Sequence, residues 1–300
     1  MKISVTGSGG FIGSHSVEGF RNKSYEVIPL GIIDSKWIRD IIKADITNSE
    51  DIKRVLLLER PDVVFHCAGK VNRAGGLDVP FEDLMVNVGG TINILEGMRK
   101  IDCNKIIFTS SSTLYGDTHY QSAKETHKKT PLLPYSLNKL LSEEYIKFYS
   151  RLYGIKYVIL RYARVYGPRQ YHNATKGVPT IFIDDILRGE RPKVYGDGSQ
   201  TRDFVYISDV VEANIMALSW ENKTVNIATQ TEVSALELLN IIKRILKSDI
   251  EPEFLPKRKY DLERFLVDIS LAKELGWKPK VSLEEGLTET INWYRSEMGL

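Results

Sequence analysis

Tyr135 and Lys139 are spaced so that they can carry out acid–base chemistry together. Four residues apart on a helix, their side chains share one face, one turn from each other. A free tyrosine has a pKa of about 10 and is a poor base at neutral pH, but a nearby positive charge favours the phenolate. Lowering that pKa by roughly 3 units takes about 4 kcal/mol. Lys139 and one further positive charge beside the phenol can supply it in a partly dry site. Tyr135 is therefore a candidate general base for oxidising a hydroxyl, with Ser111 sharing the proton.

A glycine-spaced turn near the start of the chain predicts a nucleotide site. Gly7, Gly10 and Gly13 follow the first strand-like segment and open a helix-like one. Glycine there lets the chain turn sharply, lets the backbone approach a pyrophosphate, and lets helix pack on strand. The N–H groups and dipole of the helix start then hold the phosphates. We expect these three glycines, with Phe11 and Ile12, to contact a dinucleotide whose oxidised nicotinamide is the second cation beside the tyrosine.

The end of the second predicted strand bears on which dinucleotide binds. An acidic residue there usually holds the free 2′-hydroxyl of the NAD adenosine ribose. Gly31 occupies that position here, followed by Asp34 and Lys36. Asp34 could supply the carboxylate from further on, or Lys36 could accommodate the 2′-phosphate of NADP; both stay open, with NAD preferred. Asp45 follows another predicted strand, where it either accepts from the adenine amino group or stabilises a helix N-terminus.

Strands and helices alternate through the first half of the chain. The predicted strands are residues 3–6, 26–30, 62–67, 105–109 and 157–161, and the predicted helices are 11–20, 49–58, 81–99 and 135–153. This order predicts an α/β fold, a Rossmann-type doubly wound parallel sheet with helices on both faces. Beyond residue 167 the elements shorten and prolines recur, which indicates a smaller, partly interleaved α/β substrate-binding lobe. The predicted domains are residues 1–166, with a return segment at about 203–230, and residues 167–300.

The composition excludes several classes of protein. Three hundred residues, 42% hydrophobic and 27% charged, can bury a large core and are not disordered. The net charge is +2 and the basic residues are scattered, which argues against nucleic acid as the ligand. Cys67 and Cys103 are too few for a metal cluster or a disulfide framework. No apolar run reaches membrane-spanning length and the first strand starts at Lys2, so we expect a cytoplasmic protein that binds neither membrane nor nucleic acid.

These motifs resemble the extended short-chain dehydrogenase/reductase family, and within it the sugar-nucleotide epimerase/dehydratase group. The matching stretches are residues 6–15 (TGSGGFIGSH), 66–69 (HCAG), 87–91 (NVGGT), 109–116 (TSSSTLYG) and 134–139 (PYSLNK). The resemblance implies that Ser111, Tyr135 and Lys139 are catalytic. It also implies that Ala68 and Gly69 line the cofactor, as does Ile46 beside the candidate Asp45.

The second half of the chain carries the family's substrate motifs. Residues 195–204 (YGDGSQTRDF) resemble the segment that binds the substrate nucleotide, which places Tyr195 near the base and Arg202 on the diphosphate. Residues 258–261 (RKYD) resemble its Arg-x-x-Asp, with Arg258 on the diphosphate and Asp261 on the ribose. A guanidinium fork suits phosphate oxygens because it can bind two of them at once. Arg164 stands where the family carries an Asn that touches the sugar nucleotide.

The resemblance implies an NAD-dependent 4-epimerase, most like those that interconvert UDP-glucose and UDP-galactose. Dehydration is disfavoured because Ser112 and Thr113 stand where the family's dehydratases carry Asp-Glu. The same serine, tyrosine and lysine would also serve an NADPH-dependent reductase of keto-sugar nucleotides. A non-catalytic NAD(P)-binding regulator is a further alternative, against which the intact catalytic set argues. Helices 81–99 and 135–153 form the usual dimer surface of the family, so we expect a homodimer.

Overall fold

The computed structural model describes residues 1–71, 78–118, 122–170, 177–258 and 262–300. The chain forms two compact units, each assembled from three separate stretches. Unit 1 comprises Met1–Leu114, Pro131–Arg161 and Val211–Val225, and unit 2 comprises Tyr115–Thr130, Tyr162–Val210 and Asn226–Leu300. Residues 115–118 and 122–130 thus belong to unit 2, although the sequence predicted a single domain over residues 1–166.

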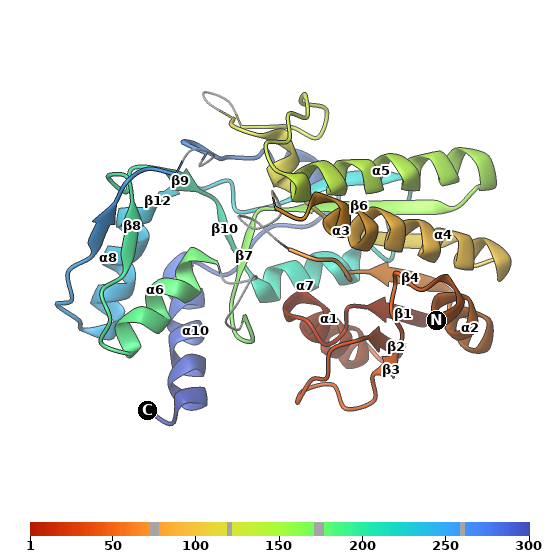
Figure 1. Cartoon of the computed structure of the whole chain (residues 1–300), viewed down its shortest axis with the longest axis horizontal. Helices are drawn as coiled ribbons and strands as arrows, with labels where there is room; N and C mark the ends of the chain where they lie inside the picture. Colours follow the sequence, from red (N-terminus) through yellow and green to blue (C-terminus); the bar gives the residue numbers. More distant parts are fainter. Residues whose placement is uncertain (72–77, 119–121, 171–176, 259–261) are drawn as a thin grey trace. The chain divides into compact units, whose positions relative to one another are not determined.

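A seven-stranded sheet with the strand order β11-β6-β5-β4-β1-β2-β3 is the centre of unit 1 (Figure 1). Its strands are β1 (Lys2–Thr6), β2 (Glu26–Gly31), β3 (Ile42–Lys43), β4 (Val63–His66), β5 (Lys105–Ser111), β6 (Lys156–Tyr162) and β11 (Lys223–Ile227). β1 pairs in parallel with β2 on one side and β4 on the other. The strands that follow β1 are therefore added first on one side of it and then on the other. In such sheets ligands bind at the carboxyl ends of the strands beside this switch point. The predicted Rossmann-type α/β fold is confirmed.

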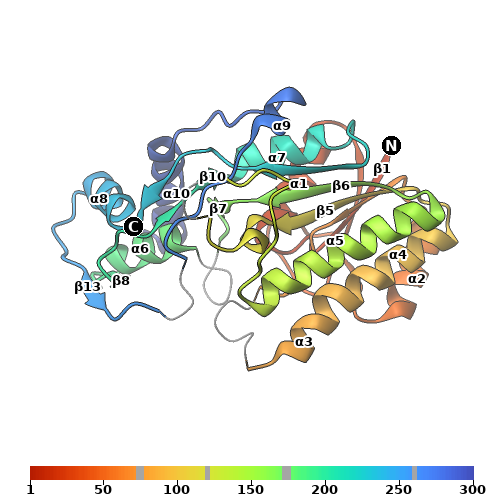
Figure 2. The same ribbon diagram turned by 90° about the horizontal axis from the view of Figure 1, so that it is seen from above.

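Helices cover both faces of this sheet (Figure 2). α2 (Ser49–Glu59), α4 (Gly90–Lys100) and α5 (Pro134–Tyr153) lie on one face, where apolar side chains of helices and strands form a continuous core. α1 (Phe11–Asn22) and the unit 1 part of α7 (Ile207–Met216) lie on the other face. The amide of Asn214 in α7 donates to the Ser16 hydroxyl of α1 at 3.0 Å. This layering fixes the ends of the strands that carry the predicted site.

One predicted helix is interrupted in the structure. Residues 81–99 do not form a single α-helix but α3 (Pro80–Leu84), a π-helical turn η2 (Met85–Gly89) and then α4. The Asn87 amide nitrogen donates to the carbonyl oxygens of Lys70 and Asp83, both at 3.0 Å, and its oxygen accepts from the Lys70 N–H at 3.1 Å. The predicted helical segment over residues 81–99 is confirmed, and its middle turn is widened to a π-helix that carries Asn87, whose side chain holds the chain that follows β4. Such turns are frequent at functional sites.

Unit 2 is built from short strands and helices. Its strands form three two-stranded pairs, which are β7 (Arg164–Tyr166) with β10 (Phe204–Tyr206), β8 (Lys193–Tyr195) with β13 (Glu253–Leu255), and β9 (Thr201–Arg202) with β12 (Val233–Ser234). Its helices are α6 (Val178–Leu187), α8 (Ala235–Leu246), α9 (Ser270–Glu274) and α10 (Leu283–Met298). The buried Trp277 indole donates to the Asp209 carbonyl oxygen at 3.0 Å and anchors the chain before α10. None of the helices in the described part of the chain has the length and apolarity needed to cross a membrane.

Candidate active site

The glycine turn between β1 and α1 is packed too tightly for side chains. Gly7 has a φ of +69°, and a Cβ on it would lie 2.8 Å from the Ala68 Cα. A Cβ on Gly13 would lie 2.1 Å from the Gly7 carbonyl oxygen. Both distances are shorter than any real contact of this kind, so only glycine lets the strand, the turn and the helix approach this closely. The turn thereby brings Ala68, at the end of β4, against the start of α1.

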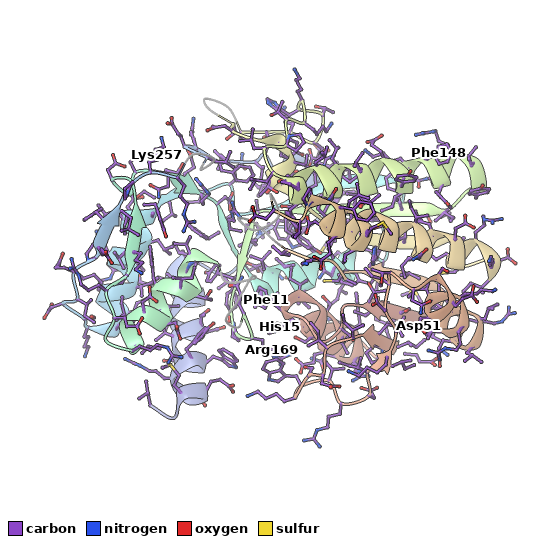
Figure 3. The ribbon with its side chains drawn as sticks, viewed as in Figure 1. Phe11, His15, Asp51, Phe148, Arg169 and Lys257 are labelled. Carbon is purple, nitrogen blue, oxygen red and sulfur yellow. The ribbon has the colours of Figure 1, made fainter. Side chains whose placement is uncertain are left out.

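The start of α1 fits the pyrophosphate of a dinucleotide. Gly10 is its N-cap and offers no side-chain cap, and the first turn of α1 contains no acidic residue. The first N–H groups of α1, those of Phe11, Ile12 and Gly13, have no acceptor within the helix and together with the helix dipole favour an anion. The Phe11 ring packs edge-on against His15, with 5.9 Å between ring centroids (Figure 3). These residues would hold the diphosphate of NAD.

Gly31 ends β2 and faces the glycine turn. A Cβ on Gly31 would lie 3.6 Å from the Ser8 hydroxyl oxygen and 3.8 Å from the Gly9 nitrogen, which is ordinary contact. The position therefore has room for a side chain that this protein lacks. The Asp34 side chain is 94% exposed, and its carboxylate pairs with the Lys43 ammonium at 2.7 Å. The ribose contact of Asp34 remains a prediction.

Asp45 and Ile46 lie in the turn between β3 and α2. One carboxylate oxygen of Asp45 accepts from the N–H and the hydroxyl of Thr47, at 2.9 and 2.8 Å. Asn48 is the N-cap of α2 and accepts from the N–H groups of the first turn. The acids in the first turn of α2 are Glu50 and Asp51, and Asp45 lies before the N-cap, so its contact with adenine stays a prediction and its alternative role beside the helix dipole is not supported. Ile46 is buried, and its carbonyl oxygen accepts from the Asn93 amide at 2.8 Å.

Buried hydroxyls and one imidazole connect β1, β4 and η2. The Thr91 hydroxyl donates to the Asn87 carbonyl oxygen at 2.6 Å, so it accepts from His66 Nε2 at 3.2 Å. His66 Nδ1 then accepts from the Thr6 hydroxyl at 2.7 Å. Burial lowers the pKa of His66 to about 3, so the ring is neutral. The Thr6 oxygen also accepts from the Ala68 N–H at 3.1 Å. The hydrogen bonds therefore link residues 6–15 to residues 66–69, two of the stretches that resemble the family.

Lys139 is buried between β5 and the ring of Tyr135. Its ammonium donates to the Thr109 carbonyl oxygen at 2.8 Å and lies 4.6 Å from the centroid of the Phe108 ring. The centroid of the half-buried Tyr135 ring is 5.9 Å from the same nitrogen. A Cβ on Gly69 would lie 3.5 Å from it, so the amine also borders the predicted cofactor segment. This is the arrangement of charge that favours a tyrosine phenolate.

Ser111 ends β5 and is connected to the first turn of α5. Its hydroxyl oxygen lies 2.9 Å from that of Thr113 and accepts from the Thr113 N–H at 3.3 Å. The Ser136 hydroxyl donates to the Thr113 hydroxyl oxygen at 3.0 Å. Ser136 immediately follows Tyr135, so the hydroxyls of Thr113 and Ser136, for which the sequence predicted no contact with Ser111, link the predicted serine to the turn of the predicted base.

A buried ion pair lies one helical turn beyond Lys139. The Glu143 carboxylate accepts from the Ser110 hydroxyl at 2.6 Å, and from Nε and Nη2 of Arg161 at 2.9 and 2.5 Å. Glu143 is fully buried and Arg161 is 1% exposed. The pair joins α5, β5 and β6 one helical turn from Lys139. This ion pair was not predicted from the sequence, although Tyr135, Lys139 and Glu143 follow one another at intervals of four.

Acidic groups surround Lys139 and oppose the effect of its burial. Burial lowers the pKa of Lys139 to about 8, while the negative charges of Glu143 and Asp83 act to raise it. Neutral His66 and the Cys67 thiol, whose own pKa burial raises to about 11, add no charge at this pH. We expect kcat to fall as the pH rises through about 8, because the ammonium loses its proton and no longer favours the phenolate. A kcat–pH profile at saturating substrate measures this. A profile that stays flat from about pH 8 to about pH 10 would contradict it.

Unit 2 contains the residues predicted to bind the substrate. The Arg258 guanidinium stacks on the Tyr195 ring, with its central carbon 3.5 Å from the ring centroid, so the structure brings these two residues together. Arg202 is buried, and its Nη1 donates to the carbonyl oxygen of the preceding residue at 2.7 Å. Arg164 is half-buried at the start of β7. Asp261 lies outside the described residues, and the ligand contacts of all five remain predictions.

Proteins of a known family are similar to this chain in sequence and in fold. Residues 3–228 match the model of the NAD dependent epimerase/dehydratase family. A putative UDP-glucose 4-epimerase from Methanocaldococcus jannaschii is 44% identical, and the alignment covers 98% of each chain. The crystal structure of UDP-glucose 4-epimerase with UDP-glucose from Thermotoga maritima is 38% identical with a TM-score of 0.96, covering 99% of this chain and 100% of that one. The Thermus thermophilus UDP-glucose 4-epimerase complex with NAD is 32% identical with a TM-score of 0.93, covering 98% and 99%. The chain therefore belongs to the NAD dependent epimerase/dehydratase family, within the extended short-chain dehydrogenases/reductases, and is an NAD-dependent sugar-nucleotide epimerase.

Proposed function

We propose that this protein interconverts UDP-glucose and UDP-galactose by transient oxidation at C4 of the hexose. The observation that carries the chemistry is the buried Lys139 ammonium 5.9 Å from the centroid of the Tyr135 ring. Ser111 supports it, because its hydroxyl is connected to the same turn of α5. The choice of substrate is supported by the likeness to UDP-glucose 4-epimerases, one of them crystallised with UDP-glucose.

Tyr135 is proposed to move the proton of the reaction. As phenolate it takes the proton of the C4 hydroxyl while that carbon is oxidised, and it returns the proton when the resulting carbonyl is reduced. Bound NAD supplies the hydride acceptor and donor, so no reductant is consumed overall. Lys139 stabilises the phenolate, and Ser111 donates a hydrogen bond to the C4 oxygen. Inversion at C4 requires that the 4-keto sugar turn in the site, so that its carbonyl is reduced from the opposite face.

The residues of unit 2 are proposed to hold the nucleotide part of the substrate. Tyr195 packs near the base, Arg202 and Arg258 bind the diphosphate, and Arg164 adds a diphosphate contact where relatives of this group carry an amide. Guanidinium groups suit this role because their planar fork binds phosphate oxygens in pairs. An anchor on the diphosphate leaves the hexose free to turn, which the inversion at C4 requires.

The activity can be measured without adding cofactor. Purified protein is incubated with UDP-galactose alone, and UDP-glucose is separated and quantified by chromatography. We expect conversion to a constant ratio of the two sugars from either direction. Folded protein with NAD bound that converts neither of them, nor another UDP-hexose, would show that the proposed function is wrong.

A reductase of keto-sugar nucleotides is a second candidate. Gly31 leaves the ribose position without a carboxylate, and Asp34 is paired with Lys43, so these residues do not oppose the 2′-phosphate of NADPH. The two candidates differ in their use of cofactor. Oxidation of free NADPH in step with product formation favours the reductase, whereas NAD retained through purification and recycled favours the epimerase. The non-catalytic regulator that the sequence left open is not supported, since relatives of this chain are epimerases and Ser111, Tyr135 and Lys139 are all present.

We also propose that two copies associate through α3 and α5. Both helices expose apolar side chains, among them Phe81, Leu137, Phe148 and Leu152; Figure 3 shows Phe148 on the outer face of α5. Phe148→Glu is expected to convert a dimer into a monomer, because it places a charge in the apolar contact. Sedimentation velocity at micromolar concentration measures this. Leu58→Glu is the matched control, because Leu58 is an exposed apolar residue of α2, outside the proposed contact. A wild-type protein that sediments only as a monomer would contradict the proposal.

A further inference from the structure

We infer that Thr113 is a positioning residue that turns the hydroxyl proton of Ser111 outward, toward the oxygen of the substrate. The inference rests on the proposed function, because it assigns a role to the environment of Ser111. Thr113 lies in the 3₁₀ turn that follows β5 and is half-buried. It contacts Ser111 on one side and Ser136 on the other.

The direction of the hydrogen bonds follows from counting donors. A hydroxyl has one proton and can accept two hydrogen bonds. Ser136 donates its proton to the Thr113 hydroxyl oxygen at 3.0 Å. We assign the proton of Thr113 to the Ser111 oxygen at 2.9 Å, because donation in the opposite direction would leave the Thr113 proton without an acceptor among the described residues. The chain of hydroxyls therefore runs in one direction, from the first turn of α5 to the end of β5.

Ser111 receives two hydrogen bonds from the same residue. Its oxygen accepts from the Thr113 N–H at 3.3 Å and, with the direction assigned above, from the Thr113 hydroxyl as well. Both acceptor positions of the serine are thereby filled, and only its proton remains available. Ser111 in this state can donate to a ligand but cannot accept from one. It is thus committed to the role of hydrogen-bond donor before the substrate binds.

A committed donor is what oxidation at C4 requires. The C4 oxygen gains negative charge as its proton passes to Tyr135, and a fixed donor stabilises that charge more than it stabilises the starting hydroxyl. Hydrogen bonds in a chain also polarise one another, so the donation by Thr113 strengthens the donation by Ser111. Without Thr113, the Ser111 hydroxyl can rotate and lose this orientation.

The proposed role also explains why a threonine rather than a carboxylate suits position 113. A carboxylate at position 113 would only accept, and the proton of Ser111 would then be drawn inward to it. Threonine both accepts and donates, and so sends that proton outward. The residue that the sequence analysis took as evidence against dehydration is therefore assigned a positive role in hydrogen transfer at C4.

Thr113→Val tests this, because it removes the hydroxyl and keeps the shape of the side chain. We expect kcat to fall about 10-fold and KM to stay within about twofold, since the lost interaction acts mainly in the transition state. Thr113→Ser should return kcat to within about twofold of wild type, because it restores the hydroxyl. Ser136→Ala breaks the chain at its other end and should lower kcat less, as Thr113 can still donate but is no longer directed. Thr288→Val, which removes a hydroxyl that donates within α10 to the Glu284 carbonyl oxygen, is the matched control.

The outcome separates this inference from the proposed function. Ser111→Ala and Tyr135→Phe are measured in parallel, together with NAD content and the thermal midpoint of each variant. If both lose activity while Thr113→Val keeps its kcat within about twofold, the inference alone is wrong. It is also overturned if Thr113→Ser is as slow as Thr113→Val, because the hydroxyl would then not be what matters. Wild-type protein without epimerase activity overturns both.

Discussion

Tyr135→Phe is expected to lower kcat by about 10²- to 10⁴-fold, the usual contribution of a general acid–base group. The substitution removes only the phenol oxygen, so the ring still packs beside the Lys139 ammonium and NAD should still bind. KM for the UDP-sugar should change little, because the nucleotide is proposed to be bound by residues of unit 2. The measurements are kcat with UDP-galactose and the NAD content of the denatured protein.

Tyr145→Phe is the matched control for this experiment. Tyr145 lies on the same helix and is 40% exposed, so the loss of its hydroxyl should leave kcat unchanged. If Tyr135→Phe retained the turnover of wild type, Tyr135 would not be the base. A fall in kcat accompanied by loss of NAD would instead mean that the variant damages the cofactor site.

Glu143→Gln is expected to lower the free energy of unfolding of unit 1 by about 3 to 5 kcal/mol. The cost is high because the variant leaves the Arg161 guanidinium charged, 1% exposed and without its counter-ion. The Ser110 hydroxyl, which now donates to Glu143 at 2.6 Å, also loses a charged acceptor. Urea denaturation followed by circular dichroism measures the change as a shift of the midpoint.

Two further variants test whether burial of the charge is the cause. Glu144→Gln removes a carboxylate from the same helix, but Glu144 pairs with Lys147 at the surface, and the expected change is below about 1 kcal/mol. The double variant Glu143→Leu/Arg161→Leu removes both buried charges and should be more stable than Glu143→Gln. Equal effects of Glu143→Gln and Glu144→Gln would exclude the buried pair as a source of stability.

The sequence by itself determined the features of this protein that depend on neighbouring residues. Alternating strand and helix patterns predicted the parallel sheet, because the side-chain period of each element is a local property. Gly7 and Gly13 could be assigned to a tight strand–turn–helix connection since no larger residue fits one. The four-residue spacing of Tyr135 and Lys139 placed them on one face of α5, and the structure places the ammonium beside the ring.

Only the tertiary structure decided which residues from distant parts of the chain meet. Asp34 pairs with Lys43, and Arg161 reaches Glu143, although nothing in the sequence around either residue names its partner. The π-helical turn at Asn87 depends likewise on the chain that follows β4. The link from Ser136 through Thr113 to Ser111 forms because β5 ends beside the first turn of α5. Long-range pairing of polar groups is set by how strands and helices pack, and it leaves no periodic trace in the sequence.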